Sequence, residues 1–149
     1  NKGVLPVVCV TNELKSLPIS NEYKNFVQNP TGIIENFTNI SSYRIDLTDE
    51  INTGNSWQLS FAIAHLLHHK NSLVFSKSKK NLGDAKNIIW STGRLNKNLD
   101  IIDVNHITSK LEISLPYLRE AIQNKVNINI CVSPNNYNEA YFFLKKNGL

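Results

Sequence analysis

The sequence contains no methionine and only two cysteines among its 149 residues. Two cysteines are too few for a disulfide framework or a four-cysteine zinc site. This excludes small domains that are held together by several disulfides or by such a zinc ion. The six glycines are scattered, so the chain has no glycine-rich phosphate-binding loop. Because position 1 is not methionine either, we expect the chain to be a fragment of a larger parent protein.

Long apolar runs are missing as well. No run approaches the ~18 residues of a membrane-spanning helix, and no charged segment followed by an apolar stretch opens the chain like a secretory signal. Together with the few cysteines, this pattern predicts a cytoplasmic protein without a membrane partner. The net charge is a modest +4. A basic cluster of Lys77, Lys79 and Lys80 is interpreted either as a solvated loop or as a patch for nucleic-acid phosphates.

The hydrophobic share of 41% is ordinary and sufficient for one core in a chain of this length. β-branched runs and alternation with period two predict strands over residues 5–10, 43–47, 88–90, 100–104 and 127–132. Helical periodicity predicts helices over residues 21–28, 57–69, 105–122 and 138–146, with Pro116 kinking or dividing the third. Because strands and helices alternate, we predict one compact α/β domain over residues 1–149, with a mixed sheet and flanking helices.

Three of the four histidines lie on one predicted helix, where His65, His68 and His69 are spaced at i, i+3 and i+4. Such spacing suits two metal ligands. The sequence offers neither the glutamate of a metalloprotease helix nor an evident third ligand. We therefore interpret these histidines as the polar edge of the helix.

A serine and a lysine are the stronger candidates for catalysis. Ser56 follows Gly54 and Asn55 at the start of the most apolar helix, where free amides and the positive end of the helix dipole suit an oxyanion hole. Lys110 lies among apolar neighbours, and burial lowers the pKa of a lysine so that it can serve a serine as general base. A serine before a helix is also typical of an ordinary N-cap, so these residues alone leave both interpretations open.

At these residues the sequence resembles the proteolytic domain of Lon proteases, serine-lysine peptidases fused to an AAA+ ATPase. The family's nucleophile motif, proline-lysine-aspartate-glycine-proline-serine-alanine-glycine before a helix of small and aliphatic residues, aligns with residues 52–64. The family's next block ends a strand in threonine-glycine and places the lysine on the following helix. Thr92, Gly93 and Lys110 match it, with the family's step of eighteen residues from threonine to lysine. The resemblance covers roughly residues 42–137.

The resemblance implies a Lon-type fold and the hydrolysis of peptide bonds in protein or peptide substrates. It assigns Ser56 as the nucleophile, Lys110 as the general base and Thr92 as the hydroxyl that holds the lysine amine. It implies no metal or organic cofactor in this domain, because ATP is consumed only by the AAA+ module of the parent chain. It also implies assembly into a homo-oligomeric ring. The substrate cleft would be formed by Gly54, Asn55 and Trp57.

Two departures from the family pattern bear on activity. Thr53 replaces the family's aspartate, and Trp57 with Gln58 replaces alanine-glycine after the nucleophile. The indole of Trp57 either points into the core or covers Ser56. We expect the core, because burying a large apolar side chain contributes on the order of 2 kcal/mol. The alternative function is an inactive Lon-like module that acts in assembly or binds nucleic acid through the basic cluster.

Overall fold

The structure is a computed structural model that describes residues 20–41, 43, 51, 54–73 and 85–149. Several sequence predictions fall outside the described residues. They are the strand over residues 5–10, the strand over residues 43–47 apart from Tyr43, the substitution at Thr53, and the basic cluster of Lys77, Lys79 and Lys80.

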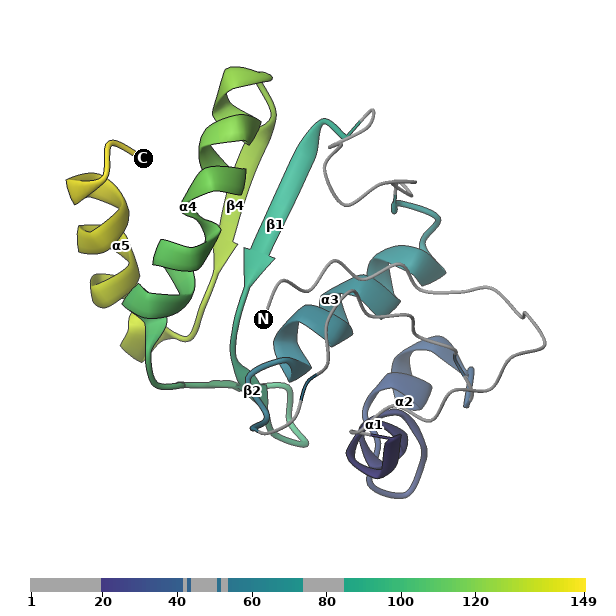
Figure 1. The fold of residues 1–149 in the computed structure, drawn as a ribbon. Coiled ribbons are helices and arrows are strands. Elements are labelled where there is room, and N and C mark those ends of the chain that lie inside the picture. The colour runs from purple at the N-terminus through teal and green to yellow at the C-terminus, as the bar shows by residue number, and fades with distance from the viewer. Residues whose placement is uncertain (1–19, 42, 44–50, 52–53, 74–84) are drawn as a thin grey trace.

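The described residues form a small mixed α/β domain (Figure 1). Its helices are α1 (Ser20–Val27), α2 (Ile34–Thr38), α3 (Gln58–His69), α4 (Ile107–Gln123) and α5 (Tyr137–Lys146), with a 3-10 turn η1 (Pro134–Asn136) before α5. Its strands are β1 (Asn87–Ser91), β2 (Arg94–Leu95), β3 (Ile101–Ile102) and β4 (Asn127–Cys131). The predicted α/β class is thereby confirmed over the described part of the chain, but helices and strands alternate only from β3 onward.

The strands pair in two separate sheets within the described residues. β1 and β4 are parallel, with Ile88 opposite Ile128 and Ser91 opposite Cys131. β2 and β3 are antiparallel. The mixed sheet expected from the sequence is not seen in the described residues, whose strands form one parallel and one antiparallel pair. Because β1 and β4 are parallel, their carboxyl ends meet at one edge, which is where α/β folds place their ligand sites.

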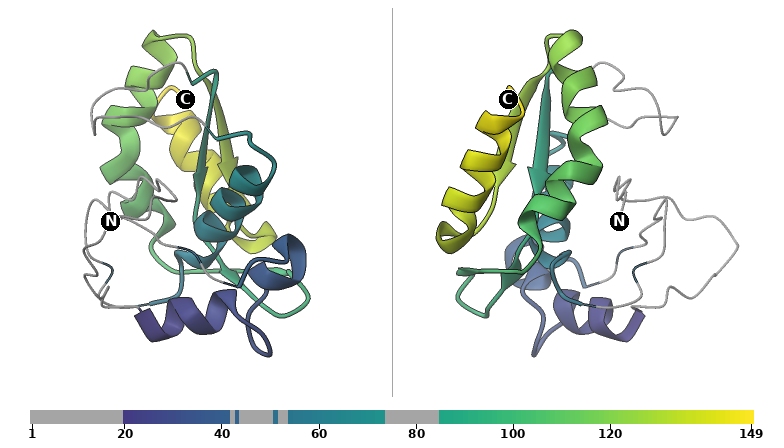
Figure 2. Two further views of the ribbon diagram at one scale, coloured as in Figure 1. Left: turned by 90° about the vertical axis from the view of Figure 1, so that its right-hand side faces the viewer. Right: turned by 60° about the vertical axis from the view of Figure 1, so that its left-hand side comes forward.

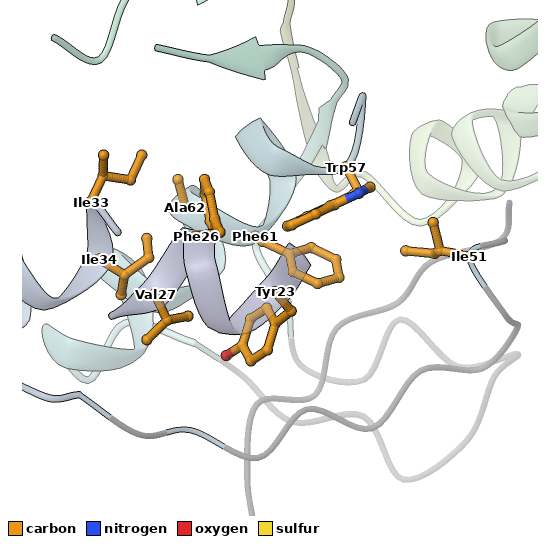
Figure 3. Close-up of a cluster of buried hydrophobic side chains, with 9 residues drawn as sticks. All are labelled: Tyr23, Phe26, Val27, Ile33, Ile34, Ile51, Trp57, Phe61 and Ala62. Atoms are coloured by element: carbon orange, nitrogen blue, oxygen red, sulfur yellow. The ribbon is translucent and has the colours of Figure 1, made fainter. Parts of the chain in front are cut away.

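Buried apolar side chains form two clusters. The first joins α1, α2 and the start of α3 (Figure 3) and contains Tyr23, Phe26, Val27, Ile33, Ile34, Ile51, Trp57, Phe61 and Ala62. The second lies between α4, α5 and the parallel strands, and its buried members are Ile107, Leu111, Leu118 and Ala140. Figure 2 shows α4 and α5 beside these strands, with α1 and α2 at the other end of the domain. The candidate site lies where α3, β1 and α4 converge.

Some details differ from the sequence predictions. α2 and β2 were not predicted, and Pro116 lies inside α4 without dividing it. α3 begins at Gln58, one residue later than expected. In the described ranges, we find no helix with the length and apolar character needed to span a membrane.

Candidate active site

A tight turn carries Ser56 to the start of α3. Gly54 has a positive φ of 83°, a conformation that glycine adopts without the strain of a side chain. The carbonyl oxygen of Ser56 accepts a hydrogen bond from the amide of Gly93 at 3.0 Å, and the amide of Leu59 donates to the carbonyl oxygen of Gly93 at 3.1 Å. These two bonds fix the serine turn to the chain segment that leaves β1.

Gly93 is buried, and a side chain at this position would require its neighbours to shift. A Cβ atom on Gly93 would lie 2.9 Å from Cγ2 of Ile101 and 3.2 Å from Cδ2 of Leu59. The side chains of Ile101 and Leu59 thus leave little room for a residue larger than glycine at this position, just beyond the end of β1.

Thr92 connects the serine turn to α4. Its amide donates to the carbonyl oxygen of Cys131 at 3.2 Å, which places it at the carboxyl ends of both parallel strands. Its buried hydroxyl donates to the carbonyl oxygen of Ser56 at 3.3 Å and accepts a hydrogen bond from Nζ of Lys110 at 3.4 Å. The structure thus brings together the backbone of Ser56, the hydroxyl of Thr92 and the amine of Lys110.

Lys110 lies in the first turn of α4, where its amide donates to the carbonyl oxygen of His106 at 3.1 Å. Its side chain is half-buried, and the neighbouring Ile107 and Leu111 are fully buried. Burial lowers the pKa of the Lys110 ammonium group, because desolvation penalises the charged form, while the negative charge of Glu139 acts in the opposite direction. The lowered pKa that the sequence predicted for Lys110 is therefore confirmed.

The hydroxyl of Ser56 has no hydrogen-bond partner among the described residues. Trp57, not Ser56, occupies the N-cap position of α3, and no side chain caps this helix end in the described chain. The interpretation of Ser56 as an ordinary N-cap therefore gains no support, and none of the described residues holds its hydroxyl by a hydrogen bond.

The amides next to Ser56 are only in part available for an oxyanion. The amide of Gln58 donates to the carbonyl oxygen of Asn55 at 3.2 Å, and the amide of Leu59 is taken by Gly93. Within the described residues the amide of Trp57 makes no hydrogen bond. We expected several free amides in this turn. Among the described residues, the amide of Trp57, directly after the serine, is the one left for an oxyanion.

The indole of Trp57 lies in the first hydrophobic cluster (Figure 3). It is 7% exposed and packs against Phe26 with 5.2 Å between ring centroids and against Phe61 with 4.8 Å. The core orientation expected for Trp57 is confirmed. Because the side chain of Trp57 faces the core, only its backbone could line the predicted substrate cleft.

A pocket of about 250 Å³ opens beside the serine turn. Its lining includes Asn55 and Gln58, which flank Ser56 and Trp57, and Phe26 and Leu95 from α1 and β2. Ser56, Thr92 and Lys110 do not line this pocket, so the substrate cleft predicted from Gly54, Asn55 and Trp57 stays a prediction. Gly54 is exposed at the start of the turn.

His65 contradicts its interpretation as part of a polar helix edge, because its side chain is completely buried. Its Nε2 atom pairs with the hydroxyl of Tyr23 at 2.7 Å and its Nδ1 atom with the carbonyl oxygen of Phe61 at 2.6 Å. The ring of Tyr43 also packs edge-on against the His65 imidazole, with 4.4 Å between the ring centroids. Burial lowers the pKa of the His65 imidazole. Over the described ranges, no group of three potential metal-ligating side chains comes together.

Comparison with models of protein families, with curated proteins and with solved structures finds no match to this chain. The chemistry of the site is therefore argued from its own residues.

Proposed function

We propose that this chain is the proteolytic domain of a serine-lysine peptidase with a Lon-type fold, which hydrolyses peptide bonds in protein substrates. The observation that supports the proposal most is the hydroxyl of Thr92, which contacts the Ser56 backbone on one side and the Lys110 amine on the other. The contact with the Lys110 amine agrees with the role that the resemblance assigns to Thr92, and the contact with the Ser56 backbone places the serine turn next to it. A half-buried lysine with a lowered pKa is also suited to act as a general base.

In the proposed reaction, Oγ of Ser56 attacks the carbonyl carbon of a peptide bond while neutral Nζ of Lys110 takes the hydroxyl proton. The amide of Trp57 donates to the oxyanion of the tetrahedral intermediate. As the carbon–nitrogen bond breaks, the lysine returns the proton to the leaving amine, and an acyl ester remains on Ser56. A water molecule then attacks the ester, passing one proton through Lys110 back to Oγ of Ser56.

Cleavage of unstructured peptides by the purified chain tests this proposal. Such substrates need no unfolding, so the AAA+ module of the proposed parent protein is not required. We expect cleavage by the unaltered chain and none by Ser56→Ala or Lys110→Ala. Lys110→Arg is also expected to be inactive, because a guanidinium group does not release its proton near neutral pH.

Circular dichroism and thermal unfolding of each variant provide the control for folding. Folded variants that still cleave would contradict the assigned mechanism. A folded, unaltered chain that cleaves no peptide over a broad pH range would favour the alternative of an inactive Lon-like module.

A further inference from the structure

We propose that Glu139, on α5, is a positioning residue that holds the first turn of α4 and places its negative charge at the turn that carries Lys110. The consequence of this inference for catalysis rests on the proposed function. The effect of Glu139 on the titration of Lys110 does not, since it is measurable without any substrate.

The start of α4 lacks a cap of its own. His106 occupies the N-cap position in the left-handed conformation, with φ of 63°, and its side chain makes no capping hydrogen bond. The amides of the first helical turn have no carbonyl partners within the helix. One of them, the amide of Thr108, donates to Oε1 of Glu139 at 3.3 Å. The missing cap is therefore supplied by a carboxylate from another helix.

The segment around η1 holds the same part of the chain at a second point. Oδ1 of Asn136 accepts from the amide of Val104 at 2.9 Å, and Nδ2 of Asn136 donates to the carbonyl oxygen of Val104 at 3.0 Å. Asn136 is buried and is itself bonded to Ser133. Asn136 thus ties the backbone of η1 to the segment that leads into α4. Glu139 follows Asn136 by three residues, so its carboxylate is held at the N-terminal end of α4.

The position of Lys110 makes this carboxylate important. Side chains in a helix tilt towards its N-terminus, so the amine of Lys110 lies over the first turn of α4. The partial positive charge of the helix start disfavours a cation there. The carboxylate of Glu139 opposes this effect and favours the protonated amine.

Glu139 is exposed, and so are the other charged or titratable side chains close to Lys110 in the sequence. Asp103 and His106 precede it and Glu112 follows it, all with exposed side chains. In the described part of the chain, Glu139 is the charged group identified as raising the pKa of Lys110. The neutral hydroxyl of Thr92 is its hydrogen-bond acceptor.

Titration of the Lys110 side chain by NMR, in Glu139→Gln and in the unaltered chain, tests the proposal. Glutamine retains an oxygen for the Thr108 amide and removes only the charge. We expect the pKa of Lys110 to fall in Glu139→Gln and to stay unchanged in Glu112→Gln, a matched control two residues from Lys110. An unchanged Lys110 pKa in Glu139→Gln, or an equal shift in the control, would overturn the proposal.

A second readout separates this inference from the proposed function. A general base must be neutral, so peptide cleavage should rise with pH as Lys110 loses its proton, and this rise should move to lower pH in Glu139→Gln. A shifted NMR titration without any cleavage in the unaltered chain would retain the role of Glu139 and contradict the peptidase. Cleavage with an unshifted profile and an unshifted titration would retain the peptidase and contradict the role of Glu139.

Discussion

The hydroxyl of Thr92 joins two parts of the chain that approach from different elements, the serine turn before α3 and the first turn of α4. It donates its own proton to the Ser56 carbonyl oxygen and accepts a hydrogen bond from the Lys110 amine, so one hydroxyl group serves both contacts. A residue at this position without a hydroxyl group would leave the Ser56 carbonyl oxygen and the Lys110 amine with one hydrogen-bond partner fewer.

We therefore expect Thr92→Val to weaken both the fold and the site. Valine has a similar shape, and a typical hydrogen bond contributes about 1 kcal/mol, so the free energy of unfolding should fall by about 1–2 kcal/mol. Urea unfolding measures this loss, and peptide cleavage measures the effect on the site. Thr92→Ser keeps the hydroxyl and should retain cleavage. Equal cleavage by Thr92→Val and the unaltered chain would show that the bridge is not needed.

Trp57 gives a second prediction at this scale. Because its indole is buried between Phe26 and Phe61, Trp57→Ala should lower the free energy of unfolding by about 3 kcal/mol and should not make Ser56 more reactive. Trp57→Phe should be milder, since the indole nitrogen has no hydrogen-bond partner in the described chain that the change could remove. Thermal unfolding and labelling of Ser56 by a serine-directed electrophile measure both effects. Faster labelling of Trp57→Ala would mean that the indole covers the serine.

At the scale of elements, His65 and Tyr23 connect α3 to α1 through one buried hydrogen bond. In the neutral imidazole one ring nitrogen donates and the other accepts, which matches a bond to the Phe61 carbonyl oxygen and one from the Tyr23 hydroxyl. A second proton on the ring would leave the Tyr23 hydroxyl without its acceptor. Burial also raises the pKa of the Tyr23 phenol, so this group stays a donor over the physiological range.

This pair predicts a loss of stability in acid. The folded state lowers the pKa of His65, so below the unfolded pKa of ~6.5 the unfolded chain binds a proton that the folded chain does not. The stabilisation is complete above that pH and should decline by at most about 1.4 kcal/mol for each pH unit below it. Urea unfolding between pH 7 and 5 measures the decline.

Two variants on α3 isolate the contribution of His65. His65→Gln does not titrate in this range, so it should be less stable at pH 7 and should lose less stability on acidification. His69→Gln, which alters an exposed histidine of the same helix, should follow the unaltered chain. If His65→Gln shows the full acid-induced decline, the buried imidazole is not its source.

The elements themselves were predictable where their patterns were long. Apolar residues at helical spacing indicated α3 and α4, and β-branched runs indicated β1 and β4, because these elements each bury one face against a core. α2 and β2 contain five and two residues, too few for a period to be recognised. Because histidine is polar, His65 was predicted to be exposed. That prediction was wrong, since its partner Tyr23 lies 42 residues away and no local pattern reveals such a contact.

At the scale of the whole molecule, each of the two hydrophobic clusters holds one part of the candidate site. Trp57 anchors the serine turn in the first cluster, and Ile107 and Leu111 anchor the lysine turn in the second. The proximity of Thr92 and Lys110 followed from the eighteen-residue step of the resemblance. The part played by Glu139 did not, because it depends on how α5 packs against α4, which is a tertiary contact between separate helices.

Labelling of Ser56 by a serine-directed electrophile, measured across pH by mass spectrometry of the intact chain and its peptides, tests the central claim most directly. If Lys110 activates Ser56, the unaltered chain should be labelled at Ser56 alone among its serines. The labelling rate should rise with pH as Lys110 loses its proton, and folded Lys110→Ala should lose this rise and label at least about tenfold more slowly. Labelling spread over several serines, or an equal rate at Ser56 in folded Lys110→Ala, would contradict the account.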